Sequence, residues 1–320
     1  MNQHKELAVV PEADLAAGLD AWDDAWARRD AAALRALLRP DAVLHADGLL
    51  LKCDVVGADA IVALNERYFE RWRYAHEVAA TAVNADKRSA LGCWVDVELA
   101  RAERGGAPEL QPPSAVVGFW RLAFDPAGKV ESVTFLRQLN LEEAGRRLLD
   151  PSKAAHGGLE PGRYRGGPAP DAAARAAFRA AAEAYSRVWQ GDEDADARVG
   201  DILTDDFSEL DLMRGEGLAG RAAFVDQVRR LHDPAAGGAY EKEAASFDIG
   251  ASRDSRVAIV HWGAAARVGG ERVRQHGFSL LAFEREGARI REAVGLRSPS
   301  APERCAILRA DAFAHAREEQ

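Results

Sequence analysis

Apolar and polar positions along the chain predict two successive series of helices followed by strands. Aromatic residues stand four apart at Trp22 and Trp26, and again at Tyr185 and Trp189. This is the spacing of neighbours on one face of a helix. After each pair the pattern predicts a second short helix, a short strand, a helix opened by glycine, and four long strands separated by turn signals. The short strands span 41–47 and 206–211, and the glycine-led helices begin at Gly57 and Gly220.

The two series match best near their ends. The run from Gly118 to Asp125 corresponds to the run from Gly277 to Glu284, and each is followed by a turn and a strand that ends in Leu-Arg. Between the two series, the stretch 150–170 is rich in Gly and Pro, a composition typical of linkers. We therefore expect one domain at 1–149, a linker at 150–170, a second domain at 171–299, and a helical tail at 300–320.

The order of elements resembles a known family. The paired aromatics, the Pro-Asp-Ala-Val run at Pro40 to Val43, and the hairpin from Leu122 to Val130 are similar to the SnoaL-like, ketosteroid-isomerase-like branch of the nuclear transport factor 2 superfamily. The resemblance covers 15–139 and 172–298. It implies an α+β fold of two tandem cone-shaped domains, each a curved antiparallel sheet wrapped around three N-terminal helices. Because this superfamily includes isomerases, cyclases, dehydratases, epoxide hydrolases and non-enzymes, function must be sought in the site.

Strand pairing predicts which side chains meet in the second domain. A two-residue turn at 269–270 places His261 opposite Phe278, and a turn at Glu286-Gly287 places His276 opposite Arg297. One mostly apolar face then carries His261, His276 and Arg297, and we expect it to face inward. An imidazole can transfer a proton near neutral pH, and a guanidinium can stabilise developing negative charge on an oxygen.

Carboxylates on the first strand of the second domain offer an alternative base. Asp211 and Glu209 share a strand face with Phe207, and the family resemblance implies a carboxylate base near this strand. We therefore predict four catalytic residues: His261, His276, Arg297 and Asp211. The predicted ligand-binding residues are Glu209, Phe207, Phe278, Gly263, Gly295, Tyr185, Trp189, His45, Asp47 and Arg137. Each could instead have a purely structural role, and Trp94, Trp120 and Trp262 are expected on outward faces covered by a partner domain, a second chain or the tail.

Composition narrows the class of protein. The 320 residues are 48% hydrophobic and 29% charged, with a net charge of −9 and no dense Lys/Arg cluster, so we expect no nucleic-acid partner. No run approaches the length of a membrane span, and the N-terminal residues carry no targeting pattern. We therefore expect a cytoplasmic protein without a membrane partner. Three cysteines without CxxC spacing argue against a metal site, and no cofactor is implied.

We expect the protein to bind a small apolar molecule that carries a carbonyl or carboxylate. Its chemistry would be cofactor-free proton transfer, as in isomerisation, cyclisation or dehydration. The alternative is a non-catalytic structural or interaction module, in which outer sheet faces join the domains as a pseudo-dimer or join chains as a homo-oligomer.

Overall fold

The structure is a computed structural model, and it describes residues 10–45, 51, 53–98, 115–139, 158–160, 162–164, 168–192, 195–213, 215–232, 240–268 and 271–298. Asp47, most of the 150–170 stretch and the tail at 300–320 lie outside these residues. We use "first half" for the described residues up to 139 and "second half" for those from 168 onward.

Helices and strands follow the same order in both halves. The first half contains α1 (Glu12–Arg28), α2 (Ala31–Leu37), β1 (Leu38–His45), β2 (Val55–Val56), α3 (Ala58–Arg71), β3 (Tyr74–Asn84), β4 (Ser89–Glu98), β5 (Ala115–Phe124) and β6 (Val130–Arg137). The second half contains α5 (Ala172–Trp189), α6 (Ala195–Ile202), β7 (Leu203–Asp211), β8 (Glu216–Ala219), α7 (Arg221–His232), β9 (Tyr240–Ala251), β10 (Val257–Val268), β11 (Glu271–Phe283) and β12 (Ile290–Arg297).

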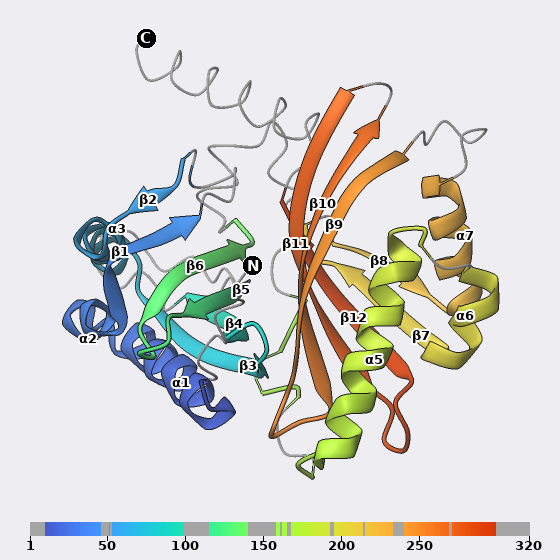
Figure 1. Ribbon diagram of the computed structural model, residues 1–320, viewed down its shortest axis with the longest axis horizontal. Coiled ribbons are helices and arrows are strands. Elements are labelled where there is room, and N and C mark those ends of the chain that lie inside the picture. The colour runs from blue at the N-terminus through green and yellow to red at the C-terminus, as the bar shows by residue number, and fades with distance from the viewer. Residues whose placement is uncertain are drawn as a thin grey trace, which may run out of the picture.

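All the strands of the described residues belong to one mixed sheet, in the order β2-β1-β6-β5-β4-β3-β9-β10-β11-β12-β7-β8. Within each half the long strands pair antiparallel, while β1 runs parallel to β6 and β7 runs parallel to β12. A single residue pair, Val83 with Ala251, joins β3 to β9 and so connects the halves. The helices lie on the outer sides of the two halves, with the strands between them (Figure 1). The predicted α+β class is confirmed.

Two of the helices begin at an aspartate that caps their first turn. Asp30 caps α2 by accepting a hydrogen bond from the amide of Ala33 at 2.9 Å, and Asp171 caps α5 through the amide of Ala174 at 2.7 Å. Such caps satisfy amides at the helix start that have no partner within the helix.

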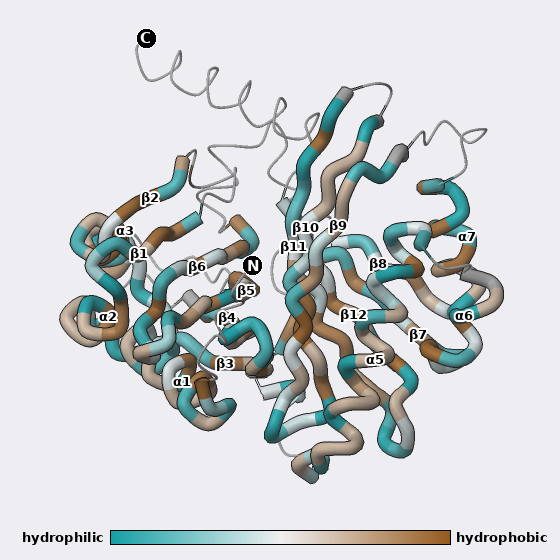
Figure 2. The backbone as a smooth tube through the Cα atoms, viewed as in Figure 1, coloured by the Kyte–Doolittle hydropathy of each residue, from teal (hydrophilic) through white to brown (hydrophobic). Residues whose placement is uncertain are grey.

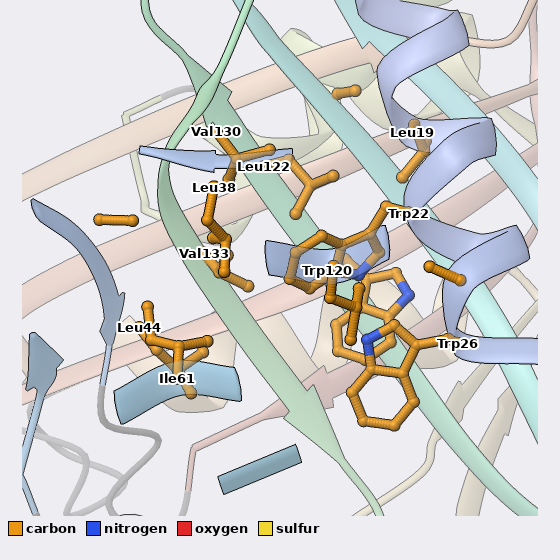
Figure 3. Packing of buried hydrophobic residues seen from close by; sticks show 14 of the residues in the cluster. Leu19, Trp22, Trp26, Leu38, Leu44, Ile61, Trp120, Leu122, Val130 and Val133 are labelled. Atoms are coloured by element: carbon orange, nitrogen blue, oxygen red, sulfur yellow. The ribbon is translucent and has the colours of Figure 1, made fainter. Parts of the chain in front are cut away.

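Tryptophans fill the interior of the first half. The ring of Trp120 packs between those of Trp26 and Trp94, with centroids 5.0 Å away in each case, and Trp22 meets Trp120 edge-on. Figure 3 shows Trp22, Trp26 and Trp120 pointing toward one another beside Leu19 and Leu122. The outward placement predicted for Trp94 and Trp120 is therefore wrong, because their face is covered from within the same half, where Trp22 and Trp26 of α1 pack against Trp120. Trp262 likewise faces its own half's helices, against the core that includes Phe178 and Phe224.

The opposite faces of the strands pack the halves together. Leu91 and Phe119 of the first half share a core cluster with Ile259, Phe278 and Leu280 of the second half. Phe119 stacks on Phe278 with centroids 5.4 Å apart and ring planes 11° apart. Figure 2 shows hydrophobic stretches on the strands where the two halves meet. These strands are therefore apolar on both faces, with helices over one and the other half over the second.

The predicted register holds for one hairpin and fails for the next. His261 pairs with Phe278, as predicted from the turn at 269–270. Arg297, however, pairs with Gly277 rather than with His276. A β-bulge between Ala282 and Phe283 inserts one extra residue on β12, and a shift of one residue turns every later side chain to the opposite face.

The first half contains the same irregularity. A bulge between Ala123 and Phe124 pairs Arg137 with Gly118, as the bulge of the second half pairs Arg297 with Gly277. Both strand-terminal arginines therefore lie on the helix-facing side of their strands.

Candidate functional site

A cavity of about 800 Å³ lies in the second half, between helices α5 and α7 and the strands β7 to β12. This volume falls in the range of small-molecule sites, roughly 300–1,000 Å³. Its wall mixes aromatic and polar side chains: Tyr185, Ser186, Trp189, Glu209, Asp211, Gln227, Phe247, Trp262, Gln275, Ser279 and Arg297, with Gly295 and Phe278 also bordering it.

The second half has small residues around this cavity at positions where the first half has larger ones. A Cβ on Gly118 would lie 2.1 Å from Trp94, and a Cβ on Gly277 would lie 2.4 Å from Trp262, so these two glycine–tryptophan pairs occupy equivalent places. Two residues beyond the glycine, the first half has Trp120 and the second has the far smaller Ser279. Other corresponding positions differ in the same sense, with Ala264 for Asp96 and Ser186 for Asp23.

Glu209 is the buried acid of the cavity. Burial raises the pKa of its carboxyl group to about 8, the hydrogen bond from Tyr185 lowers it, and the nearby charge of Asp211 raises it again. Its Oε2 atom is buried without a hydrogen-bond partner among the described residues. A carboxyl group with a pKa near neutrality can both give and accept a proton, which general acid–base catalysis requires.

Asp211 and Arg297 form an ion pair in the same wall. The Nε atom of Arg297 lies 3.7 Å from Oδ2 of Asp211, and both side chains are partly exposed. The parallel register of β7 and β12 places them together, since Asp211 pairs with Gly295, two residues before Arg297. The bulge that contradicts the predicted partner of Arg297 is therefore what turns this guanidinium into the cavity.

The predicted convergence of His261, His276 and Arg297 is wrong. His261 and His276 lie on the face that meets the first half, with ring centroids 6.0 Å apart, whereas Arg297 lies on the cavity face. Gly263 pairs with His276 on the same interface face, and Phe207 is fully buried in the core of the second half. Of the predicted ligand-binding residues, the cavity is bordered by Tyr185, Trp189, Glu209, Gly295 and Phe278, although the ring of Phe278 stacks on Phe119 of the first half.

His261 stays uncharged at the junction of the halves. Burial lowers its pKa to about 3, and the charges of Arg121 and His276 lower it further against the opposing charge of Asp248. Its Nε2 atom is buried without a partner among the described residues. The side chain of His261 therefore lies at the interface between the halves and not in the cavity.

The first half holds a buried histidine between two aspartates. The imidazole Nδ1 of His76 lies 2.7 Å from Oδ1 of Asp96, and its Nε2 lies 3.6 Å from Oδ1 of Asp23. The indole of Trp120 donates a 3.0 Å hydrogen bond to the same oxygen of Asp23. Burial lowers the pKa of His76, but the hydrogen bonds and charges of the two aspartates outweigh it and raise the pKa to about 9.

The remaining predicted residues of the first half are not part of the cavity. His45 is half-exposed and lies 3.2 Å from Asp54, and its expected partner Asp47 lies outside the described residues. Arg137 is buried, donates to the carbonyl of Gln138, and lies over the ring of Tyr68.

Strand parity alone places several site residues on the wrong side of the sheet. It predicts Trp262, Ser279 and Gln275 on the outer face, because it takes the more apolar face as the inner one. Asp96 shares the corresponding face of the first half with Trp94. The sequence offered one signal: Asp96 stands two residues from Trp94 on the same strand face, and a tryptophan, being mostly buried in folded proteins, favours an inward orientation for that face.

In the described part of the chain, no group of three or more His, Cys, Asp or Glu side chains is arranged to hold a metal ion. Among the same residues, no helix has both the length and the apolar character needed to cross a membrane.

Comparison with known proteins identifies related folds. Neither models of protein families nor curated proteins match the sequence. A steroid delta-isomerase from Pseudomonas aeruginosa is 23% identical over 43% of this chain and 94% of its own, with a TM-score of 0.32. A protein with a cystatin-like fold from Methylobium petroleophilum PM1 is 16% identical over 41% of this chain and 80% of its own, with a TM-score of 0.33. The predicted resemblance to ketosteroid-isomerase-like proteins is confirmed as a likeness of fold.

Proposed function

We propose that the chain is a tandem pair of cone-shaped, SnoaL-like units, and that the second half binds a small apolar molecule with a carbonyl or carboxylate. The observation that carries this proposal is the buried Glu209 carboxyl group in an aromatic-walled cavity of about 800 Å³. The rings of Trp189 and Trp262 would contact the apolar body of the ligand. The guanidinium group of Arg297, which is paired with Asp211, would donate a hydrogen bond to the carbonyl or carboxylate oxygen of the ligand.

The cavity suits proton transfer next to a carbonyl group. Ionised Glu209 would remove a proton from the carbon adjacent to the carbonyl, which leaves an enolate and a protonated carboxyl group. Arg297 would stabilise the enolate oxygen. The protonated carboxyl group of Glu209 would exchange its proton with solvent, and transfer of this solvent-derived proton to the carbon would complete the exchange. This assigns the acid–base role to Glu209 in place of the two histidines, which lie on the other face.

A bicyclic ketone tests both parts of this proposal. We would incubate the protein with 2-tetralone in deuterated buffer and follow exchange of the protons beside the carbonyl by NMR, with the buffer rate subtracted. We expect protein-dependent exchange that is lost in Glu209→Gln, while 2-tetralone still binds. The rate should rise with pH and level off above about pH 8, because only the ionised carboxylate accepts the proton.

Two further outcomes separate the alternatives. Equal affinity for 2-naphthoic acid and 2-tetralone would extend the ligand class to carboxylates. If Trp262→Ala leaves the affinity for both compounds unchanged, the cavity is not their binding site and the proposal fails. Binding without exchange would support a small-molecule-binding protein that is not a catalyst. The alternative of a non-catalytic structural or interaction module predicts neither binding nor exchange. In the structure the halves meet through Phe119 and Phe278, not through the tryptophan faces on which that alternative relied.

A further inference from the structure

Three polar contacts from the first half end on two neighbouring residues of β9. The amide nitrogen Nδ2 of Asn84 donates to Oδ1 of Asp248 at 2.8 Å, and Nε of Arg121 donates to Oδ2 of the same carboxylate at 2.6 Å. The ammonium group of Lys87 donates to the backbone carbonyl of Phe247. Both oxygens of Asp248 are thus held by the first half, and the residue is only 4% exposed.

These contacts lie directly behind the wall of the cavity. Successive side chains of a strand point to opposite faces, so Asp248 points toward the first half while Phe247 borders the cavity. Phe247 pairs with Trp262 on β10, which also borders the cavity. If Asp248 lost its partners and moved away from the first half, the rings of Phe247 and Trp262 that border the cavity would therefore move with it.

The backbones of the halves also come close at this point. A Cβ on Gly250 would lie 2.9 Å from the backbone nitrogen of Val83 and 2.9 Å from Leu91. Only glycine permits this approach, two residues beyond Asp248. The part of β9 that follows Phe247 is therefore held against the first half twice, by the charged pair at Asp248 and by the close backbone approach at Gly250.

In the first half, bulkier side chains stand at positions where the second half has small ones. The equivalent of Ser279 is Trp120, whose indole is hydrogen-bonded to Asp23. We propose that Arg121 and Asn84, acting through Asp248, are positioning residues that fix the aromatic wall at Phe247 and Trp262 and so set the width of the cavity. This inference rests on the proposed function for its consequence in binding, while the positioning itself is measurable without a ligand.

A spectroscopic signature tests the positioning directly. We would label the protein with 5-fluorotryptophan, assign the Trp262 resonance with Trp262→Phe, and compare ¹⁹F spectra of the wild type, Arg121→Leu and Arg121→Lys. Arg121→Leu should shift or broaden the Trp262 resonance, and Arg121→Lys should restore it because an ammonium group can still pair with Asp248. The matched control is Arg175→Leu, which removes an ion pair between the halves from Arg175 on α5 to Glu12 on α1.

Binding then shows whether the wall sets specificity. We expect Arg121→Leu and Asp248→Asn to weaken binding of 2-tetralone about tenfold, while Arg121→Lys and Arg175→Leu stay within about twofold of the wild type. Binding of cyclohexanone, which has a single ring and needs less of the wall, should change less in every variant.

The spectra test the positioning of the wall, and the binding data test the proposed function, so the failure of one can be told from the failure of the other. An unmoved Trp262 resonance in Arg121→Leu, or equal effects of Arg121→Leu and Arg175→Leu on that resonance, overturns the inference. If the resonance moves but neither ketone binds the wild type, the proposed function fails and the positioning of the wall stands.

Discussion

Replacing Glu209 with glutamine should make the protein markedly less sensitive to alkaline pH. The carboxyl group is buried and its pKa is raised from 4.5 to about 8 in the folded chain. Between these values the folded state keeps the proton that the unfolded chain has released. The contribution of the neutral carboxyl group to stability is thus fully present below about pH 4.5 and is lost as the pH rises through about 8. Glutamine has a similar shape and carries no charge at any of these pH values.

The size of the effect follows from the pKa difference. Each pKa unit corresponds to about 1.4 kcal/mol, so a shift from 4.5 to about 8 lowers the free energy of unfolding of the wild type by up to about 5 kcal/mol across this range. Glu209→Gln should lack this slope. Near pH 5 the two proteins should agree within about 1 kcal/mol, because the amide can still accept the hydrogen bond from Tyr185.

Urea unfolding at several pH values between about 5 and 9, followed by circular dichroism, measures the difference. All other titrating groups are shared by the two proteins, so their contributions cancel. Asp226→Asn is the control, since it removes an exposed carboxyl group on α7. A difference between wild type and Glu209→Gln that stays constant with pH would refute the assignment of a buried, protonated Glu209.

The remaining predictions concern the interface and the buried networks. His261→Gln should resist acid unfolding better than the wild type. As the pH falls from 6.5 through about 3, the wild type loses up to about 5 kcal/mol of its free energy of unfolding, because the imidazole takes up a proton in the unfolded chain but stays neutral in the folded one. Acid unfolding curves that coincide for the two proteins would contradict this. Asp96→Ala should lower the free energy of unfolding at pH 7 by about 3 kcal/mol, because it leaves the buried imidazole of His76 without its 2.7 Å partner; urea unfolding with exposed Asp24→Ala as control measures this. Gly277→Ala should cost about 1–3 kcal/mol, since the new Cβ would lie 2.4 Å from the ring of Trp262; a melting temperature equal to that of the wild type would contradict the packing.

Local pattern was enough to predict the elements and the simplest hairpin. Aromatic residues four apart predicted α1 and α5, where Trp22 and Tyr185 are buried against their cores. The turn at 269–270 predicted the pairing of His261 with Phe278 because a two-residue turn leaves a hairpin only one register. These features depend on neighbours along the chain.

The register of the last hairpin depended on a bulge that no local pattern marks. Phe283 pairs with Ile290, as the turn predicts, but Ala282 pairs with Glu292, so Arg291 is the extra residue. A bulge bends its strand and increases the local twist, and whether the packing of the sheet requires such a bend is decided only in the assembled structure. It decided that Arg297 joins Asp211 in the cavity rather than the two histidines.

Alternation along β10 and β11 determined from the sequence which residues share a face, and this holds for His261 with Phe278 and for Trp262 with Gly277. It did not determine which face meets the helices, because both faces are apolar. The tertiary structure determines which face meets the helices, because Phe119 of the first half stacks on Phe278 and leaves the other face to the helices. Tertiary structure also made the cavity, because its empty volume arises where small side chains on α5, β10 and β11 meet, and residues so far apart in the chain become neighbours only when the protein folds.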